Sequence, residues 1–200
     1  YNIEIEVDEK TFQSKNLKSQ LLEIHEIASK HYKNELQDNK NIKYKNYLQS
    51  RNINNEMIDI FDIGCSGKNN QQLLDHLRTK KFSSEAMQKS GLFINGKKGY
   101  YDRFRNRIMF PIADRNNKII AFGGRVFDSD DPAKYVNSSE TLIYNKSNIL
   151  YGLSKTKDFL SKENTAVVVE GYLDLIQLYQ NGIKNVVAAS GTSFTDNHAT

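Results

Sequence analysis

The sequence predicts a protein of mixed α+β and α/β class, with a helix-rich N-terminal part that includes a small antiparallel sheet, followed by a βαβ unit with parallel strands. Three observations predict this class. Apolar residues recur at helical spacing over the first half, two strand-like runs flank a polar turn near the middle, and a strand–helix–strand pattern ends the chain. The 200 residues can form one large domain or two small ones with real cores.

The N-terminal half reads as helices. Residues 1 to about 15 alternate between apolar and acidic side chains and predict an edge strand or a linker. An amphipathic helix follows, because its apolar residues repeat every three or four positions. These residues are Leu17, Leu21, Ile24, Ala28 and Tyr32. Shorter helices are expected over 43–49, 55–61, 70–78 and 84–90, with Gly64 and Gly91 at positions typical of C-terminal caps.

The period changes from helical to alternating after Gly99. Residues 107–112 and 118–126 are strand-like, and the polar residues 113–117 between them predict a hairpin turn. A loop over 127–132 comes next, and a helix is expected over 154–161.

The C-terminal segment predicts a βαβ unit. Strands are expected at 166–169 and 185–189, around a helix at 172–181 that Gly182 ends. Two strands joined through a helix are expected to pair in parallel with a right-handed crossover.

Two acids stand at the end of the first of these strands. Glu170 ends an apolar run that reads as a buried strand, and Asp174 lies in the first turn of the next helix. Open α/β sheets bind ligands at the carboxyl ends of their strands, and Mg²⁺ prefers a few oxygen ligands. The pair therefore suits a metal site. A helix-start Asp beside a solvent-exposed Glu explains the same residues without a metal.

A basic segment precedes this unit. If residues 101–107 are extended, Arg103, Arg105 and Arg107 project to one side, because side chains alternate along a strand. Three guanidiniums on one face suit a phosphate backbone. A solvated strand face partly neutralised by Asp102 is the alternative.

Further cations follow a pair of glycines. Gly123 and Gly124 precede Arg125, and flexible glycines let backbone N–H groups approach a ligand. The cations Lys134 and Lys146 come later, each close to an aromatic residue and to an Asn. A hairpin with a glycine bulge would explain the glycines structurally.

Composition excludes several classes of site. The single cysteine, Cys65, excludes an intrachain disulfide and a cysteine-based zinc site, and it reads as a small buried hydrophobe. A reducing, cytosolic setting is the default. The pair His25 and His31 reads as helix surface. No apolar run is long enough to span a bilayer. The chain begins without Met and stops just after a strand-like segment, so a fragment is expected.

These segments, in this order, resemble the catalytic core of bacterial-type DNA primases. The resemblance is specific from about residue 90 onward and weaker from Leu17. The segments that carry it are Tyr101-Asp102-Arg103-Phe104-Arg105-Asn106-Arg107, Ala121-Phe122-Gly123-Gly124-Arg125, Lys134-Tyr135-Val136-Asn137-Ser138, Tyr144-Asn145-Lys146, Leu150-Tyr151-Gly152-Leu153, Val168-Val169-Glu170-Gly171-Tyr172-Leu173-Asp174 and Gly191-Thr192-Ser193-Phe194-Thr195-Asp196-Asn197-His198.

The resemblance implies three parts: a linker or edge strand (1–16), a basic N-terminal subdomain (17–145) and a partial, Rossmann-like Toprim domain (146–200). It implies templated synthesis of short RNA primers with Mg²⁺ or Mn²⁺. Glu170 and Asp174 would be catalytic metal ligands. Residues for nucleotide and template would be Arg125, Lys134, Asn137 and Lys146. Those for DNA would be Arg103, Arg105 and Arg107.

The implied partners are single-stranded DNA, ribonucleoside triphosphates and the RNA–DNA hybrid, in the replication machinery of the bacterial cytoplasm and without a membrane. Zinc and the replicative helicase would bind domains absent from this chain. The family's Asp-x-Asp pair should lie beyond Thr200, so the chain alone is expected to bind nucleic acid weakly and to make no primers.

Three other functions are compatible with the pattern. A phage-type primase–helicase would continue through a long linker into a helicase domain. Another Toprim protein, a topoisomerase or an OLD-type nuclease, shares the Glu-Gly element but not the basic segments. A non-catalytic nucleic-acid-binding module would lack the second acidic pair.

Overall fold

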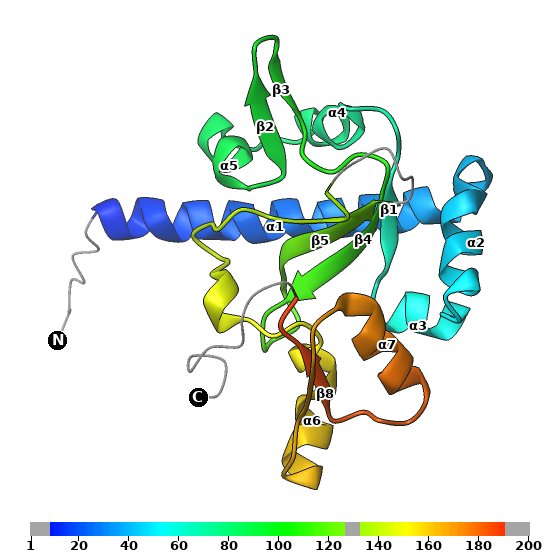
Figure 1. Cartoon of the computed structure of the whole chain (residues 1–200). Coiled ribbons are helices and arrows are strands. Elements are labelled where there is room, and N and C mark those ends of the chain that lie inside the picture. Colours follow the sequence, from blue (N-terminus) through cyan, green and yellow to red (C-terminus); the bar gives the residue numbers. More distant parts are fainter. Residues whose placement is uncertain (1–8, 127–132, 191–200) are drawn as a thin grey trace, which may run out of the picture.

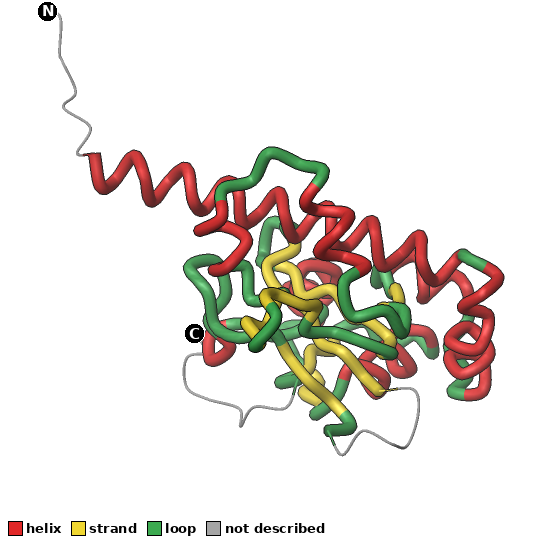
Figure 2. Tube along the Cα trace, turned by 90° about the horizontal axis from the view of Figure 1, so that it is seen from above, coloured by secondary structure: helices red, strands yellow, loops and turns green. Residues whose placement is uncertain are grey.

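The computed structural model of the chain describes residues 9–126 and 133–190. Its longest element, α1 (Glu9–Gln37), runs along one side of a small sheet, and the C-terminal βαβ unit lies on the other side (Figure 1). Seen from above, α1 is a long rod that runs beside the strands, and its N-terminal turns extend past them (Figure 2). The fold class predicted from sequence is confirmed. The expected loop at 127–132 and the segment 191–198 lie outside the described residues.

The central sheet has four antiparallel strands in the order β1-β4-β5-β6. Its strands are β1 (Gly64–Ser66), β4 (Arg107–Ala113), β5 (Ile119–Val126) and β6 (Tyr135–Asn137). The predicted hairpin between β4 and β5 is confirmed, with Asp114 Oδ1 accepting hydrogen bonds from the backbone N–H groups of Asn116 and Lys118. The register shifts at Ile112 and Ala113, not at the glycines.

Two hydrophobic cores lie on the two faces of this sheet, because neighbouring side chains of a strand point to opposite faces. Ile108 and Phe110 of β4 belong to the core shared with the βαβ unit, whereas Met109 belongs to the core under α1. The predicted apolar face of α1 is confirmed, since Leu21, Ile24, Ala28 and Tyr32 are all buried. The sheet is therefore covered on both faces.

Short elements complete the N-terminal part. They are η1 (Asn39–Asn41), α2 (Ile42–Ser50), α3 (Asn55–Ile60), α4 (Gln72–Arg78), α5 (Ser84–Lys89) and the antiparallel pair β2 (Phe93–Gly96) and β3 (Gly99–Asp102). The four shorter helices were predicted. Asn54 and Ser83 cap α3 and α5, each side chain accepting from a backbone N–H three residues later.

One predicted helix cap is wrong. The residue with positive φ after α3 is Asp62 (φ 51°), and the N–H of Ile63 bonds the carbonyl of Ile58. Gly64 instead begins β1, a strand that the sequence analysis missed. A Cβ at Gly64 would lie 2.5 Å from the carbonyl carbon of Tyr32, so the glycine permits close packing against α1. Gly91 (φ 72°) and Gly182 (φ 92°) do follow helix ends, as predicted.

Two further predictions for the N-terminal region need correction. The expected edge strand or linker over residues 1–16 is wrong for residues 9–16, which form the first turns of α1. The Lys, Glu and Gln residues there favour a helix and outweigh the short alternating pattern. His25 is buried, not on the surface: its ring lies parallel to Phe122, and Nδ1 donates to the Leu21 carbonyl at 2.7 Å. Cys65 is buried, as expected, and burial raises the pKa of its thiol to about 12.

The C-terminal part contains η2 (Lys146–Asn148), α6 (Leu153–Glu163), β7 (Val167–Val169), α7 (Tyr172–Gln180) and β8 (Val186–Ala188). The parallel pairing of β7 and β8 is confirmed. The burial of β7 is not: Val167 is 37% and Val168 44% exposed. Within the described residues β7 pairs with β8 alone, so its valines lack cover. The division at residue 145 stays a prediction.

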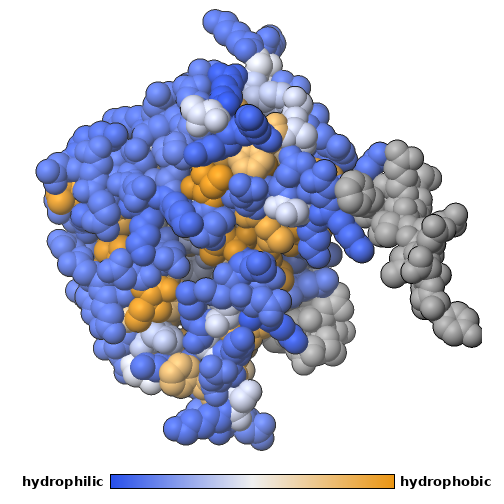
Figure 3. All heavy atoms as spheres, turned by 180° about the vertical axis from the view of Figure 1, so that it is seen from behind, coloured by the Kyte–Doolittle hydropathy of each residue, from blue (hydrophilic) through white to orange (hydrophobic). Residues whose placement is uncertain are grey.

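The surface is mostly polar. Hydrophilic residues cover most of the face opposite to that of Figure 1, with a few hydrophobic residues near its middle (Figure 3). Within residues 9–126 and 133–190, none of the helices combines the length and apolar character that a bilayer crossing requires.

Candidate active site

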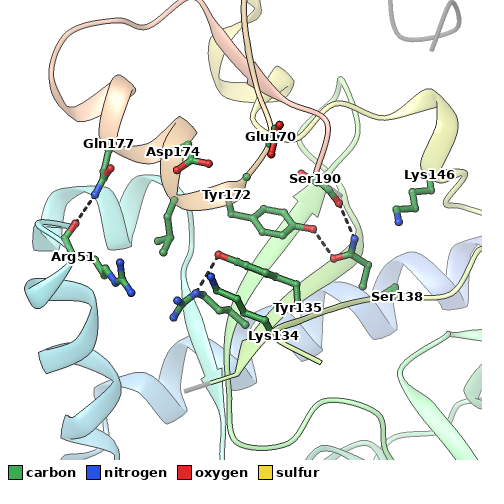
Figure 4. A pocket seen from close by; sticks show the side chains of 14 residues that line it. Arg51, Lys134, Tyr135, Ser138, Lys146, Glu170, Tyr172, Asp174, Gln177 and Ser190 are labelled. Carbon is green, nitrogen blue, oxygen red and sulfur yellow. Dashed lines mark hydrogen bonds between the residues drawn. The ribbon is translucent and has the colours of Figure 1, made fainter. Parts of the chain in front are cut away.

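A pocket of ≈ 670 Å³ opens between the basic edge of the central sheet and the βαβ unit (Figure 4). Its charged lining residues are Arg51, Arg125, Lys134, Lys146, Glu170 and Asp174, and its uncharged ones include Tyr135, Asn137, Tyr172, Gln177 and Ser190. All six residues predicted for metal, nucleotide and template thus line one pocket, although the chain separates them by up to some fifty positions. The spacing of these residues along the chain does not by itself predict that they lie close together.

The two acids stand on one side of the pocket (Figure 4). Glu170 directly follows β7, and Asp174 lies in the first turn of α7. Both side chains are exposed, and neither forms a hydrogen bond or ion pair with the described residues. Because their oxygen atoms are unengaged by the described residues, they fit a hard cation such as Mg²⁺. They are only two ligands: residues 9–126 and 133–190 contain no group of three or more His, Cys, Asp or Glu side chains that could hold a metal.

The opposite wall is basic. Arg125, in β5, is only 7% exposed, whereas Lys134 is exposed and Lys146 half-buried. Arg51 joins them from the C-terminal end of α2. Among the described lining residues these four cations face two acids, and this excess of two positive charges favours an anion.

Tyrosine rings hold the two guanidiniums. The Nε of Arg51 donates to the Tyr47 hydroxyl at 2.9 Å, and the Nε of Arg125 donates to the Tyr135 hydroxyl at 3.1 Å. The Arg125 guanidinium also lies 4.6 Å from the centre of the Tyr47 ring, and that of Arg51 lies 5.3 Å from the same centre. One ring therefore contacts both cations.

A hydrogen-bonded chain crosses the floor of the pocket. The Tyr172 hydroxyl donates to Asn137 Oδ1 at 2.7 Å, and Asn137 Nδ2 donates to the Ser190 carbonyl at 2.9 Å. Tyr172 also stacks on Phe110, with ring centres 4.9 Å apart, and its burial raises the pKa of its hydroxyl. Asn137 thus bridges β6, α7 and the end of β8, and its amide carbonyl is already engaged.

The glycines beside the pocket serve packing. Gly123 and Gly124 are buried inside β5, not flexible at its end. A Cβ at Gly123 would lie 2.3 Å from the Tyr172 hydroxyl oxygen, and one at Gly124 would lie 2.7 Å from the Phe104 ring. The expected close approach is therefore made by neighbouring side chains of the protein itself.

The three arginines of residues 101–107 do not share one face. β3 ends at Asp102, and Asn106 has a positive φ of 53°, so the chain turns between them. Arg107 is buried, with Nη1 donating to the carbonyls of Gly124 (3.2 Å) and Ala133 (2.9 Å). Arg103 donates to Ser139 Oγ at 2.5 Å. Arg105 is exposed over the Tyr101 ring.

Asp102 also has a different role from the one considered. It is buried, and its carboxylate accepts hydrogen bonds from the backbone N–H groups of Leu73 (2.9 Å) and Leu74 (3.0 Å) at the start of α4. Burial raises the pKa of this carboxyl, although these hydrogen bonds act in the opposite direction. Asp102 therefore fixes α4 and does not neutralise the arginines.

A second hollow lies beside this turn. It is lined by Lys40, Lys43, Gly67, Lys68, Asn69 and Gln72. The turn at residues 103–107, called the arginine turn below, is linked to this hollow by Asn106. The Asn106 N–H donates to the Gly67 carbonyl, and the Asn106 side chain accepts from Lys43. Lys43 and Lys68 thus lie near the arginine-bearing segment 103–107, whereas Lys40 is ion-paired with Glu35 and Asp38.

The sequence analysis did not identify Arg51, Tyr47 and Gln177. Tyr47 is in α2, Arg51 directly follows it and Gln177 is in α7, in segments that were predicted only as helices or connections. The Gln177 side chain donates to the Arg51 carbonyl at 2.8 Å, which ties α7 to the end of α2 (Figure 4). No local motif marks such a contact between residues 126 positions apart.

Two family models match the chain. The model of the DNA primase catalytic core, N-terminal domain, matches residues 31–157, and that of the Toprim domain matches residues 164–200. The chain is 43% identical over 162 residues to a DNA primase of Clostridium acetobutylicum, covering 80% of this chain and 26% of the relative. A DNA primase of Rickettsia bellii is 41% identical over 180 residues, which cover 90% of this chain and 29% of the relative.

Solved structures agree with these matches. The RNA polymerase domain of Mycobacterium tuberculosis primase DnaG has a TM-score of 0.86 and 34% identity, over 90% of this chain and 59% of that one. A DnaG primase catalytic domain bound to single-stranded DNA has a TM-score of 0.85 and 34% identity, over 92% of this chain and 57% of that one. The chain spans about a quarter of the length of the curated relatives that it matches.

Proposed function

The chain belongs to the DNA primase family, and on this premise we propose that it forms the nucleotide- and template-binding part of an enzyme that synthesises short RNA primers on single-stranded DNA. The observation that carries the proposal is the pocket, in which four cations from both parts of the chain face two acids at the end of a strand. Such an arrangement suits phosphoryl transfer, where the protein supplies position and field.

The cations would hold the substrate's phosphates. Arg51 and Arg125 offer planar, bidentate donors, whereas Lys134 and Lys146 act as point charges. Asn137 would position the template side of the pocket through its bridge to Tyr172 and Ser190. Together these groups would hold the α-phosphate of a ribonucleoside triphosphate beside a primer 3′-hydroxyl.

Glu170 and Asp174 would hold Mg²⁺, or Mn²⁺, through their exposed carboxylates. When bound, such an ion neutralises the charge that develops on the transferred phosphoryl group. The predicted Asp-x-Asp pair beyond Thr200 would complete the ligand set. Zinc would belong to a separate domain.

The DNA track would follow the basic region outside the pocket. Arg105 and Arg103 stand at its turn, and the hollow with Lys43 and Lys68 continues it. Arg107 is not part of this track, because its guanidinium bonds backbone carbonyls beneath the surface. Phosphate contacts of this kind give affinity without sequence preference. A template strand and, after synthesis, an RNA–DNA hybrid would lie there.

The setting follows from the family. The proposed partners are single-stranded DNA and ribonucleoside triphosphates, with the replicative helicase contacting another domain of the complete primase. The proposed location is the bacterial cytoplasm, at the replication machinery.

Primer synthesis by the complete primase tests the proposal. Glu170→Gln keeps the size of the side chain and removes its charge, so incorporation should fall by at least about 10³-fold. The affinity for single-stranded DNA should stay within about twofold, because Glu170 is outside the proposed track. Glu163→Gln, at the end of α6, is the matched control and should synthesise normally. Undiminished primer synthesis by the Glu170 variant would refute the assignment.

A further inference from the structure

Arg51 and Arg125 carry like charges on one wall of the pocket, and the Tyr47 ring stabilises both through cation–π contacts. This ring lies under the guanidiniums of both Arg51 and Arg125, at 5.3 and 4.6 Å from its centre. A second ring, that of Tyr135, also contacts Arg125, with 5.7 Å between the guanidinium and the ring centre. Each cation–π contact stabilises its guanidinium, and more strongly when the cation is desolvated. The order Arg51–Tyr47–Arg125–Tyr135 is called the ladder below.

The hydrogen bonds of the ladder select one edge of each guanidinium. Both arginines use Nε toward a tyrosine hydroxyl, at 2.9 Å for Arg51 and 3.1 Å for Arg125. Among the described residues, no carboxylate lies within ion-pair distance of either guanidinium. The terminal N–H groups, which form the fork that binds phosphate, are thus left for a ligand in the pocket.

The ladder also joins two separate parts of the fold. Tyr47 and Arg51 lie four residues apart, at the end of α2, whereas Arg125 and Tyr135 face each other across β5 and β6. A third element is also attached, because the Gln177 side chain of α7 donates a hydrogen bond to the Arg51 carbonyl. Long, flexible arginine side chains lose rotamer entropy when they bind a ligand. Anchoring them before the ligand arrives lowers that cost.

We infer that Tyr47 and Tyr135 are positioning residues, which hold Arg51 and Arg125 with their terminal N–H groups turned toward the polyphosphate of the substrate. This inference rests on the proposed function, since it assumes that the pocket binds a triphosphate. Tyr47 is the stronger of the two, because it contacts both guanidiniums. It acts through the arginines and does not itself contact the reacting atoms.

Calorimetric titration of this chain with inorganic triphosphate, without divalent metal, tests the inference. Tyr47→Leu removes the ring and the hydroxyl, and should weaken binding about tenfold. Tyr47→Phe keeps the ring and should recover most of this loss, to within about threefold of the parent chain. The melting temperatures of the two variants should be equal. Recovery of binding in Tyr47→Phe then shows that the loss in Tyr47→Leu comes from the missing ring and not from a general structural defect.

Tyr179→Leu is the matched control. It removes another partly buried tyrosine, whose ring contacts Lys184 at 5.5 Å but does not line the pocket. This variant should bind triphosphate like the parent chain. Equal weakening by Tyr47→Leu and Tyr179→Leu would overturn the inference, as would unchanged binding in Tyr47→Leu.

Arg125→Gln separates this inference from the proposed function. Loss of triphosphate binding in Arg125→Gln, with normal binding in Tyr47→Leu, would overturn the ladder alone. Normal binding in Arg125→Gln would instead show that the pocket is not the triphosphate site, and both proposals would fall.

Discussion

The two sides of the pocket differ in how firmly the chain holds them. On the basic side, Arg125 is almost fully buried and both guanidiniums are fixed by tyrosines. On the acidic side, Glu170 and Asp174 are exposed, without a hydrogen bond or ion pair to the described residues. The two arginines of the basic side are therefore held in place by the protein itself, whereas no described residue holds the two carboxylates.

The strands beneath the two sides show the same contrast. β5, which carries Arg125, is buried on both faces between two hydrophobic cores. β7, which leads to Glu170, exposes Val167 and Val168. A cation on a covered strand keeps its position, and an acid on a half-covered strand gains freedom.

The largest expected effect on the basic side concerns its stability against acid. It arises from His25, whose buried ring stacks on Phe122 of β5. Burial lowers the pKa of His25 to about 4 from its ordinary value of 6.5. Between these values the unfolded chain binds a proton that the folded chain does not, so stability is complete above pH 6.5 and is lost as pH falls toward 4. The free energy of unfolding should drop by ~2 kcal/mol between roughly pH 7 and pH 5 from this residue.

Urea unfolding of the chain at several pH values measures this drop. His25→Phe keeps a buried ring and should remove most of the pH dependence. His76→Phe, at an exposed position that contacts His31 and not His25, should retain most of it. If the parent chain and the His25 variant lost stability equally on acidification, the buried imidazole would not be the cause.

A smaller effect is expected at the arginine turn, where a buried and an exposed arginine can be compared directly. Arg105→Ala should weaken binding of single-stranded DNA by a few-fold and reduce the slope of log affinity against log salt by about 0.7 to 1. Arg107→Ala should mainly destabilise the fold, since it removes the buried guanidinium that donates to the carbonyls of Gly124 and Ala133. Arg115→Ala, in the exposed hairpin turn, is the control for DNA binding. An unchanged salt slope in Arg105→Ala would remove this residue from the track.

Elements with strong local signals were predictable from the sequence. The apolar face of α1, the β4–β5 hairpin and the parallel pairing of β7 and β8 each follow from a period or a turn that a few neighbouring residues define. The three-residue strand β1 was missed, because so short a run has no period and its glycine resembled a helix cap.

The candidate site was predictable only in part. The resemblance to DNA primases indicated Arg125, Lys134, Asn137, Lys146, Glu170 and Asp174, which all line the pocket. It did not indicate Tyr47 or Arg51, whose place depends on long-range packing of α2. The arginines of residues 103–107 were placed on one face because the alternation rule assumes an extended chain, and the positive φ of Asn106 breaks it.

We propose that the basic side binds the triphosphate by itself and that the acids act only through a metal. Calorimetric titration of this chain with inorganic triphosphate, with and without Mg²⁺, tests this division of roles in the variants Glu170→Gln and Arg125→Gln. Without Mg²⁺, Arg125→Gln should weaken binding by about tenfold, and Glu170→Gln should leave it unchanged or slightly tighter. With Mg²⁺, Glu170→Gln should lose the additional affinity that the metal gives the parent chain. Equal weakening by Glu170→Gln in both conditions would show that the acid contributes to triphosphate binding without a metal.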